Sequence, residues 1–343
     1  MSTATEVVGA PAGVPRAPRT GAKKKRRGET RVAIYLVAPT LILLAVVIGY
    51  PVVSAIIMSF QKDAGLDPAT GLFVAGGFAG ISNYAHWILQ QCLDTSGNTI
   101  SCPPGNLGSQ FWNATGVTFF FAVVTVALET AFGVWMAIIM NRTFRGRGLV
   151  RAAILVPWAI PTAVTAKLWF FIFATSGIAN ALLQTQILWT SDEWASRFAI
   201  IIADTWKTTP FMALLILAGL QIIPEDVYEA AKMDGATTFQ QFWRITLPLI
   251  RPALMVAVLF RILDALRIYD LPAILTGGGG GTGNATTTLS ILVVDQIRQG
   301  FNSASALSTI TFIIIFIVAF IFVRVLGTNV VRTQQAQQKG AAK

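Results

Sequence analysis

Six apolar segments, each long enough to cross a lipid bilayer, constrain the fold of this chain more than any other feature. They cover residues 32–60, 115–140, 150–173, 198–220, 252–275 and 307–327. A helix needs about 20 mostly apolar residues to cross the hydrocarbon core. Only 12% of the 343 residues are charged, against about 25% in soluble domains. The sequence therefore predicts an all-α integral membrane protein with six transmembrane helices.

Two of these segments contain prolines. Pro51 lies in the first segment, and Pro157 and Pro161 lie in the third. Proline lacks a backbone donor and its ring crowds the preceding turn, so it bends or breaks a helix. We expect kinks or broken helical turns at both places.

Basic residues predict the orientation of the helices. Lys and Arg number 26 against 16 Asp and Glu. The basic residues concentrate in the N-terminal tail, in loop 141–151 and towards the C-terminus. Such residues are retained on the cytoplasmic side, so both termini are expected inside the cell. The loops expected outside are 61–114, 174–197 and 276–306.

The same features divide the chain into regions. Residues 1–30 are rich in Pro, Gly, Lys and Arg, which cannot build a core, and are expected to form a disordered basic cytoplasmic tail. Residues 31–330 form the expected membrane domain. Residues 331–343 form a second cytoplasmic tail.

The two cysteines, Cys92 and Cys102, both lie in loop 61–114, and His86 is the chain's single histidine. Without a C-x-x-C pair, no zinc or iron–sulfur site is expected. Two interpretations remain open for the cysteines. They form a disulfide if the loop faces an oxidising compartment, or they are two free thiols.

A glycine-rich run at 276–283 resembles a phosphate-binding loop at first sight. Such a loop requires Lys followed by Ser or Thr, whereas Asn284-Ala285 follows here. We interpret the run as a flexible turn. Because no nucleotide site is visible, any ATP-driven step is expected on another chain.

A charged segment, residues 221–250, separates the fourth and fifth apolar segments on the expected cytoplasmic side. Pro224 suits the first position of a helix, since its missing N–H has no partner there. Two acidic residues follow, where the helix dipole favours negative charge, and Gly235 suits the left-handed stop. The pattern predicts a helix over 224–235.

A second short helix is predicted over 238–245, ending before Leu247-Pro248. On the first helix, Val227, Ala230 and Ala231 form a narrow apolar face that is flat enough for close approach. From the residues alone, a solvated connector and a docking element are equally good interpretations.

Seven residues of this segment fit the pattern E-A-A-x3-G-x9-I-x-L-P: Glu229, Ala230, Ala231, Gly235, Ile245, Leu247 and Pro248. The pattern resembles the cytoplasmic signature of the membrane subunits of binding-protein-dependent ABC importers. The stretches 141–148, 155–161, 204–211 and 275–278 are similar to the maltose-permease-like carbohydrate branch of that family. The resemblance covers residues 30–330. It implies the type I importer permease fold, with Glu229 as a polar anchor for an ATPase subunit, Ala230 and Ala231 as a flat contact, and Gly235 as a turn.

Four charged residues at a spacing of three fall within the fifth apolar segment: Arg261, Asp264, Arg267 and Asp270. On a continuous helix they follow one side, where opposite charges one turn apart can pair. Charges inside a membrane are costly and mark transport paths. We interpret the stripe as lining a watery path, with structural ion pairing as the alternative.

The third and fourth segments add polar and aromatic side chains, the combination that a sugar pocket requires. Some of these residues lie near the expected outer interface, where an anchoring role is the alternative. The resemblance implies sugar contacts at Trp158, Thr162, Asp204, Lys207, Thr208, Phe211, Asp264 and Arg267. The maltose permease has mainly amides where this chain has charged residues, so the sugar is not fixed by the resemblance.

The resemblance implies a non-catalytic permease subunit of an ATP-driven sugar importer in the bacterial inner membrane. The overall pattern is closest to disaccharide permeases, trehalose importers among them. The implied partners are a second permease, two ATPase subunits that bind ATP and Mg²⁺, and an external sugar-binding protein. The alternatives are an ion-coupled secondary transporter and an ABC permease for glycerol-3-phosphate.

Overall fold

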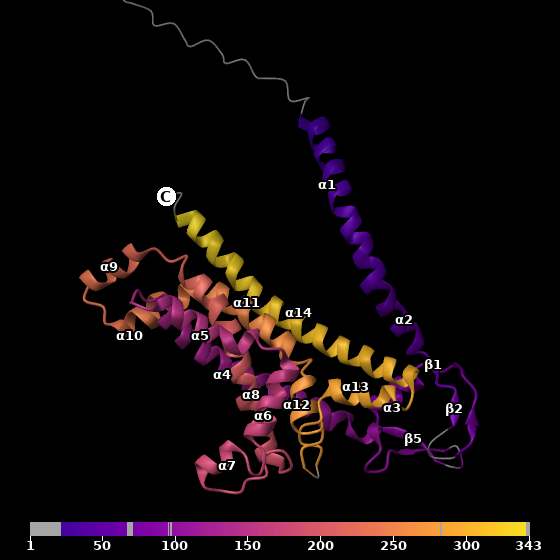
Figure 1. Ribbon diagram of the computed structural model, residues 1–343. Helices are drawn as coiled ribbons and strands as arrows, with labels where there is room; N and C mark the ends of the chain where they lie inside the picture. Colours follow the sequence, from indigo (N-terminus) through magenta and orange to yellow (C-terminus); the bar gives the residue numbers. More distant parts are fainter. Residues whose placement is uncertain (1–21, 67–70, 95, 97, 282, 341–343) are drawn as a thin grey trace, which may run out of the picture. The chain divides into compact units, whose positions relative to one another are not determined.

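The structure, a computed structural model, describes residues 22–66, 71–94, 96, 98–281 and 283–340 (Figure 1). The chain divides into two compact units, residues 1–54 and 55–343. Helix α1 (Ala22–Leu44) of the first unit continues through a π-helical turn η1 (Ala45–Gly49) into α2 (Tyr50–Met58), whose last four residues belong to the second unit. Residues 22–30, which we expected to be disordered, are the first turns of α1, because Lys, Arg, Ala and Glu are good helix formers. Residues 1–21 of the predicted tail lie outside the described residues.

The membrane segments expected from the sequence are confirmed. Among the described residues, five helical stretches are long and apolar enough to cross a membrane, and a bent helix pair raises this to six if it counts as one span. The five stretches are Ile34–Met58, Leu107–Asn141, Glu193–Leu220, Thr238–Ala265 and Phe301–Arg324. The fold is therefore an all-α membrane fold.

The bent pair is the third predicted segment. Helices α5 (Arg147–Ala159) and α6 (Thr162–Ile172) meet at an angle of 93°. Ile160 and Pro161 adopt extended backbone between them. Because Pro161 cannot donate a backbone hydrogen bond, it ends the helical ladder at this point. The predicted break thus lies at Pro161, while Pro157 is accommodated inside α5.

The fifth segment begins earlier and ends earlier than predicted. Helix α10 (Thr238–Gln241), a π-helical turn η3 (Phe242–Thr246) and α11 (Leu247–Ala265) follow one another without a gap. Helix α12 (Asp270–Leu275) is separate. The expectation of one helix over 252–275 was wrong. A continued helix would place the Pro272 ring against the carbonyl of Ile268, whereas the first turn of a new helix tolerates proline.

Both π-helical turns precede a proline by the same spacing. The N–H of Leu247 donates to the carbonyl of Phe242, and Pro248 follows. Likewise the N–H of Tyr50 donates to the carbonyl of Ala45, and Pro51 follows. A π-turn inserts an extra residue into the helix, which lets the chain pass a proline without breaking. The predicted stop before Leu247-Pro248 was therefore wrong, and the expected kink at Pro51 takes the form of a π-turn.

Three helices form the centre of the second unit: α4 (Phe111–Asn141), α8 (Glu193–Leu220) and α11. Small residues bring them close together. A Cβ atom on Gly133 of α4 would lie 2.9 Å from Cβ of Met212, and one on Gly219 of α8 would lie 2.5 Å from Cβ of Ala253. Membrane helices pack closely through such small residues.

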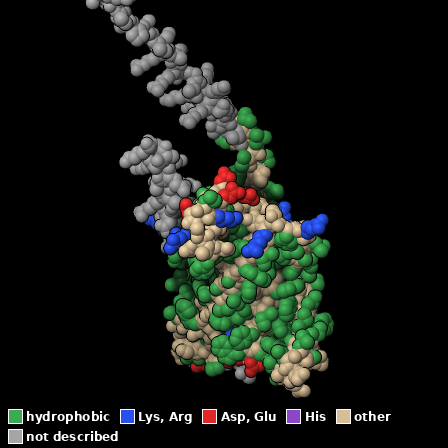
Figure 2. Space-filling view, turned by 90° about the vertical axis from the view of Figure 1, so that its left-hand side faces the viewer, with side chains coloured by type: hydrophobic (Ala, Val, Ile, Leu, Met, Phe, Trp, Pro, Cys, Tyr) green, Lys and Arg blue, Asp and Glu red, His purple; other side chains and the backbone are tan. Residues whose placement is uncertain are grey.

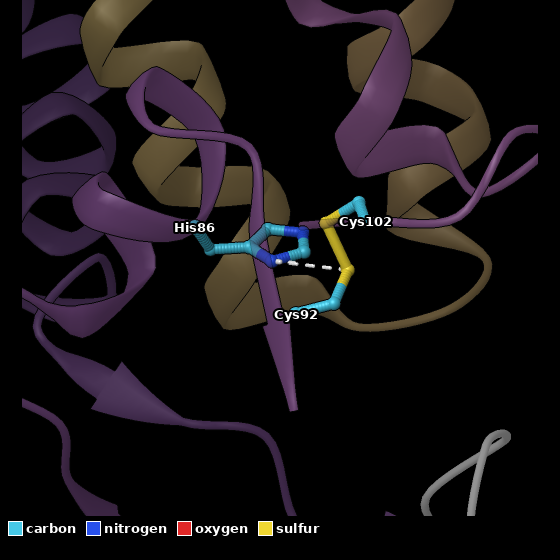
Figure 3. A group of neighbouring side chains, drawn as sticks. All are labelled: His86, Cys92 and Cys102. Carbon is cyan, nitrogen blue, oxygen red and sulfur yellow. Dashed lines mark hydrogen bonds between the residues drawn. A yellow bond between two sulfur atoms is a disulfide. The ribbon is translucent and has the colours of Figure 1, made fainter. Parts of the chain in front are cut away.

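The loop over 61–114 builds a small cap. It contains paired strands β1 (Gln61–Lys62) with β4 (Gly77–Phe78), β2 (Gly65–Leu66) with β3 (Phe73–Val74), and β5 (Gln91–Leu93) with β6 (Thr99–Ser101). Helix α3 (Ser82–Ile88) and the 3-10 turn η2 (Leu107–Gln110) complete it. A disulfide joins Cys92 to Cys102 beside His86 (Figure 3).

This cap is attached to the last helix, α14 (Phe301–Gly340), which follows α13 (Leu289–Ile297). The carboxylate of Asp63 accepts hydrogen bonds from the backbone N–H groups of Asn302 and Ser303, at 2.7 and 2.9 Å. The indole N–H of Trp87 donates to the carbonyl of Ser303 at 3.1 Å. Within the second unit, the cap and α7 (Ile178–Leu183) lie at the end opposite to α9 (Glu225–Met233) and α10 (Figure 1).

Candidate transport path and coupling loop

A single arginine joins the three central helices. Arg261 of α11 is only 2% exposed and contacts carboxylates from α4, α8 and α11. Its Nε and Nη2 bond both oxygens of Glu129, Nη2 also bonds Asp204, and Nη1 lies 2.9 Å from Oδ2 of Asp264. A buried charge is stable only when it is paired in this way. We call these four residues the Arg261 cluster.

The hydroxyl of Thr208 extends the Arg261 cluster along α8. Its Oγ1 lies 2.5 Å from Oε1 of Glu129 and 2.6 Å from the carbonyl oxygen of Asp204. Asp204 and Thr208 were both predicted from the sequence as sugar contacts, and the structure brings them together with Asp264. Asp204 is buried, whereas the side chain of Asp264 is 67% exposed.

Lys207 connects α8 to the break in the third span. Its Nζ donates to the carbonyl of Ile160 at 2.9 Å. That carbonyl lies at the end of α5, where the helical ladder stops. The ammonium group therefore satisfies a backbone acceptor that the bend leaves without a helical partner.

The remaining predicted sugar contacts lie on neighbouring elements. Trp158 is half exposed and stacks on Phe211, with ring centroids 6.0 Å apart. Thr162 begins α6 and is partly buried. Arg267 is exposed beyond the end of α11, where its Nε donates to the carbonyl of Leu263 at 3.2 Å. Because α11 stops at Ala265, the predicted stripe is wrong as one helical face. Only Arg261 and Asp264 share that face.

The charged loop forms the predicted helix α9. Pro224 is the residue before the helix rather than its first residue, because its backbone is extended. At the other end, the N–H of Gly235 donates to Lys232 and the N–H of Ala236 donates to Ala231, at 3.0 and 2.9 Å. Gly235 has a φ of +76°. This is the glycine stop that the sequence predicted.

The predicted contact face of α9 is only partly available. Glu229 and Ala230 are exposed, but Ala231 is buried. Ala231 therefore faces the inside of the loop in this chain, and its role in a flat outer contact stays a prediction. Tyr228, on the turn before it, lies 3.1 Å from the hydroxyl of Thr246 in η3. Of the other signature residues, Ile245 and Leu247 are partly buried and Pro248 is exposed.

The second half of the loop contacts α9 through the hydroxyl groups of Thr246 and Tyr228. Thr237 and Gln240 form a reciprocal capping box at the start of α10. A cavity of about 610 Å³ lies between this loop and the ends of α4 and α8. Its walls include Asn141, Arg142, Leu220, Tyr228, Lys232 and Phe239. Charged side chains gather at this end of the second unit, above an apolar wall (Figure 2).

Comparison with known proteins decides the family. Residues 129–333 match the family described as "Binding-protein-dependent transport system inner membrane component". This chain belongs to that family. The match begins at Glu129 and includes α8, loop 221–250 and the Arg261 cluster.

Two named transport permease proteins are similar over nearly the whole chain. The "Trehalose/maltose transport system permease protein MalF" of Thermococcus litoralis is 37% identical over 308 residues, covering 88% of this chain and 96% of the relative. The "Trehalose transport system permease protein SugA" of Mycobacterium tuberculosis is 37% identical over 313 residues, covering 90% and 92%. The chain is thus a transport subunit of a multi-pass membrane family.

A solved structure shares the fold of this chain. It is one chain of a bacterial ABC transporter involved in the import of the acidic polysaccharide alginate. The TM-score is 0.70 at 18% identity, covering 90% of this chain and 99% of the other. The predicted ABC importer permease fold is therefore confirmed.

Two features of this transport subunit escaped the sequence analysis. Glu129 is a fully buried carboxylate in an otherwise apolar segment, a signal that the cost of membrane charge could have revealed. Large apolar side chains are exposed on loop 221–250: Met233 at 88%, with Phe239 and Trp243. Met233 stands between Lys232 and Asp234, so periodicity gave no hint of it, whereas Phe239 and Trp243 are four residues apart and their rings are in contact.

Proposed function

We propose that the chain is the permease subunit of an ATP-driven importer of uncharged sugars, with disaccharides such as trehalose as the first candidates. The observation that carries this proposal is an exposed carboxylate, Asp264, held by a buried arginine inside the membrane segment of a family of transport subunits. Carboxylates accept hydrogen bonds from sugar hydroxyl groups, and aromatic faces such as Trp158 stack on sugar C–H faces.

The sugar path follows the eight residues implied by the resemblance. Asp264, Arg267 and Trp158 are exposed, and we assign direct sugar contacts to them first. Thr162, Thr208 and Phe211 are partly buried and complete the wall. Asp204 and Lys207 are buried and engaged with Arg261 and Ile160, so they contact sugar only when the helices rearrange.

The loop 221–250 is the proposed coupling element. Glu229 and Ala230 contact a partner ATPase, with Met233 and Phe239 as apolar contacts beside them. Gly235 ends the docking helix, and Ile245, Leu247 and Pro248 join it to α11. ATP and Mg²⁺ bind to the partner chains. Closure of the ATPase dimer moves the loop and switches the path between inward and outward access.

The proposed assembly contains a second homologous permease, two ATPase subunits and an external sugar-binding protein, in the bacterial cytoplasmic membrane. Both termini and the coupling loop face the cytoplasm. Helix α9 and the cap lie at opposite ends of the second unit, which supports a cytoplasmic loop and an external cap (Figure 1). A solved alginate transporter of the same fold was crystallised with its substrate-bound periplasmic protein, which supports the last partner.

Reconstitution of the assembly in proteoliposomes tests the function. ATP-dependent uptake of trehalose or maltose in the presence of the binding protein is the expected result. Uptake that persists without ATP and collapses with the ion gradient would instead indicate a secondary transporter. ATP-driven uptake of glycerol-3-phosphate without uptake of free sugars would contradict the sugar assignment.

A further inference from the structure

Glu129 makes three polar contacts although it is completely buried. Its two oxygens bond Nε and Nη2 of Arg261, and Oε1 also lies 2.5 Å from the hydroxyl of Thr208. Arginine and carboxylate form this two-point contact in one plane. Glu129 therefore fixes the orientation of the guanidinium as well as its position.

The orientation decides where the free edge of Arg261 points. With Nε and Nη2 bonded to Glu129 and Asp204, Nη1 is directed at Asp264, 2.9 Å away on the same helix. Thr125 of α4 lies 3.5 Å from Nη2 and closes the inner side. A lysine could not make these contacts together, because its ammonium lacks the planar fork.

Asp264 is the one acidic group of the Arg261 cluster that reaches solvent. An exposed carboxylate on a helix samples several rotamers, and ordering it on binding costs free energy. Here Nη1 of Arg261 holds Oδ2, and the rest of the carboxylate remains available. The group is thus ordered before a ligand arrives.

We propose that Glu129 and Arg261 are positioning residues that hold Asp264 ready to accept hydrogen bonds from the hydroxyl groups of an uncharged sugar. This inference rests on the proposed function and adds which residues prepare its site for the sugar. The Arg261 cluster contains three carboxylates and one guanidinium. The exposed member of this cluster is the carboxylate of Asp264, which accepts hydrogen bonds from hydroxyl groups and repels sugar phosphates and other anions that approach it.

A double-mutant cycle between Glu129→Gln and Asp264→Asn tests the positioning role. Equilibrium binding of radiolabelled trehalose or maltose, whichever is imported, is measured on the purified complex with the second permease and the ATPase. Gln keeps the size of Glu129 but removes its charge and turns one acceptor into a donor. We expect Kd to rise about tenfold for Glu129→Gln alone, and less than about twofold when Asp264→Asn is already present.

The control is Thr118→Val, which removes another buried hydrogen bond of α4, the one accepted from Leu289 N–H at 2.9 Å. It should leave Kd unchanged, because Thr118 is remote from the Arg261 cluster in the sequence of α4. If Glu129→Gln does not assemble, Arg261→Lys takes its place in the cycle with the same expectation. Glycerol-3-phosphate serves as the anionic probe, and it should compete poorly with wild type.

Several results would overturn the inference. If Glu129→Gln raises Kd by the same factor with and without Asp264→Asn, its role is merely structural. The same conclusion follows if Thr118→Val raises Kd as much as Glu129→Gln does. Strong competition by glycerol-3-phosphate would refute the substrate class. If the wild type imports sugar with ATP but its membrane part binds none, the site is absent while the proposed function stands. If it imports no sugar at all, the proposed function itself fails.

Discussion

The hydroxyl groups of Tyr228 and Thr246 lie 3.1 Å apart and join helix α9 to the π-turn η3. From η3 the helix continues without a gap through α11 to Arg261 and Asp264. The charged loop and the Arg261 cluster are therefore the two ends of one mechanical element. Movement of the loop is therefore expected to displace the Arg261 cluster inside the membrane.

Reversing the charge of Glu229 should uncouple transport. The side chain is exposed on α9, so Glu229→Lys should leave folding and membrane insertion intact. A like charge at a protein interface costs several kcal/mol, and we expect ATP-driven uptake to fall at least about tenfold. Glu225→Lys makes the same change at the start of the same helix and should retain most uptake. Normal uptake by the Glu229 variant would refute the anchor.

Removing the exposed carboxylate should impair the path without affecting assembly. Asp264→Ala takes away a charged acceptor, a loss that typically costs about 1.5–3 kcal/mol, or roughly tenfold or more. Uptake should fall accordingly while the ATPase subunits still copurify. Asp270→Ala, at the first turn of α12, is the matched control and should have little effect. Unchanged uptake and sugar preference in Asp264→Ala would contradict the path.

The glycine stop of the coupling loop should not tolerate a side chain. Gly235 has a φ of +76°, and an alanine in this left-handed region costs about 1–2 kcal/mol. Gly235→Ala should therefore lower the local stability of the loop, measured as the hydrogen-exchange protection of α9. It should also lower ATP-driven uptake. Gly148→Ala is the control, because Gly148 lies within helix α5 with open space around it. Equal protection of α9 in both variants would argue against the stop.

The cap should lose stability in acid through His86. Burial lowers the pKa of the His86 imidazole from its ordinary value of 6.5, against a smaller raising effect of the bond to the Gln91 carbonyl. The unfolded chain then binds a proton more readily than the folded one, so stability is complete above about pH 6.5 and falls as the pH drops below it. Thermal unfolding between pH 7.5 and roughly 5.5 should show this loss.

His86→Gln keeps a polar side chain but does not titrate, so its unfolding temperature should change less over the same interval. The neighbouring disulfide, Cys92–Cys102, remains oxidised in both proteins and does not contribute to the difference (Figure 3). Identical pH profiles for the two proteins would show that His86 does not control the stability of the cap.

The apolar segments and the loop helix could be predicted because local rules decide them. A long apolar run that crosses a membrane can adopt few structures, and the helix is one of them. Gly235 marks the end of its helix because glycine adopts the left-handed backbone there without strain. Helix continuity was harder. The spacing of Arg261, Asp264 and Arg267 fits one helix. The helix ends at Ala265, however, because a continued helix would bring the ring of Pro272 against a carbonyl of the preceding turn. At Pro248 the opposite occurred, because a π-turn carried the helix past a residue that usually stops one.

The centre of the path depended on contacts between distant segments. Nothing in the order of residues shows that Glu129 meets Arg261, which lies 132 positions away. Burial also separated two neighbours that the sequence treats alike, since Ala230 is exposed and Ala231 is not. Such distinctions arise only when the helices pack.

The hold of Asp63 on the first turn of α14 has a consequence for signals arriving from outside. A carboxylate that accepts hydrogen bonds from two successive N–H groups joins the cap to the first turn of the last membrane helix. A protein that settles on the cap cannot shift it without pulling on α14. Movement of the cap on binding is thus transmitted into the bilayer through α14, a helix that contributes no residue to the Arg261 cluster.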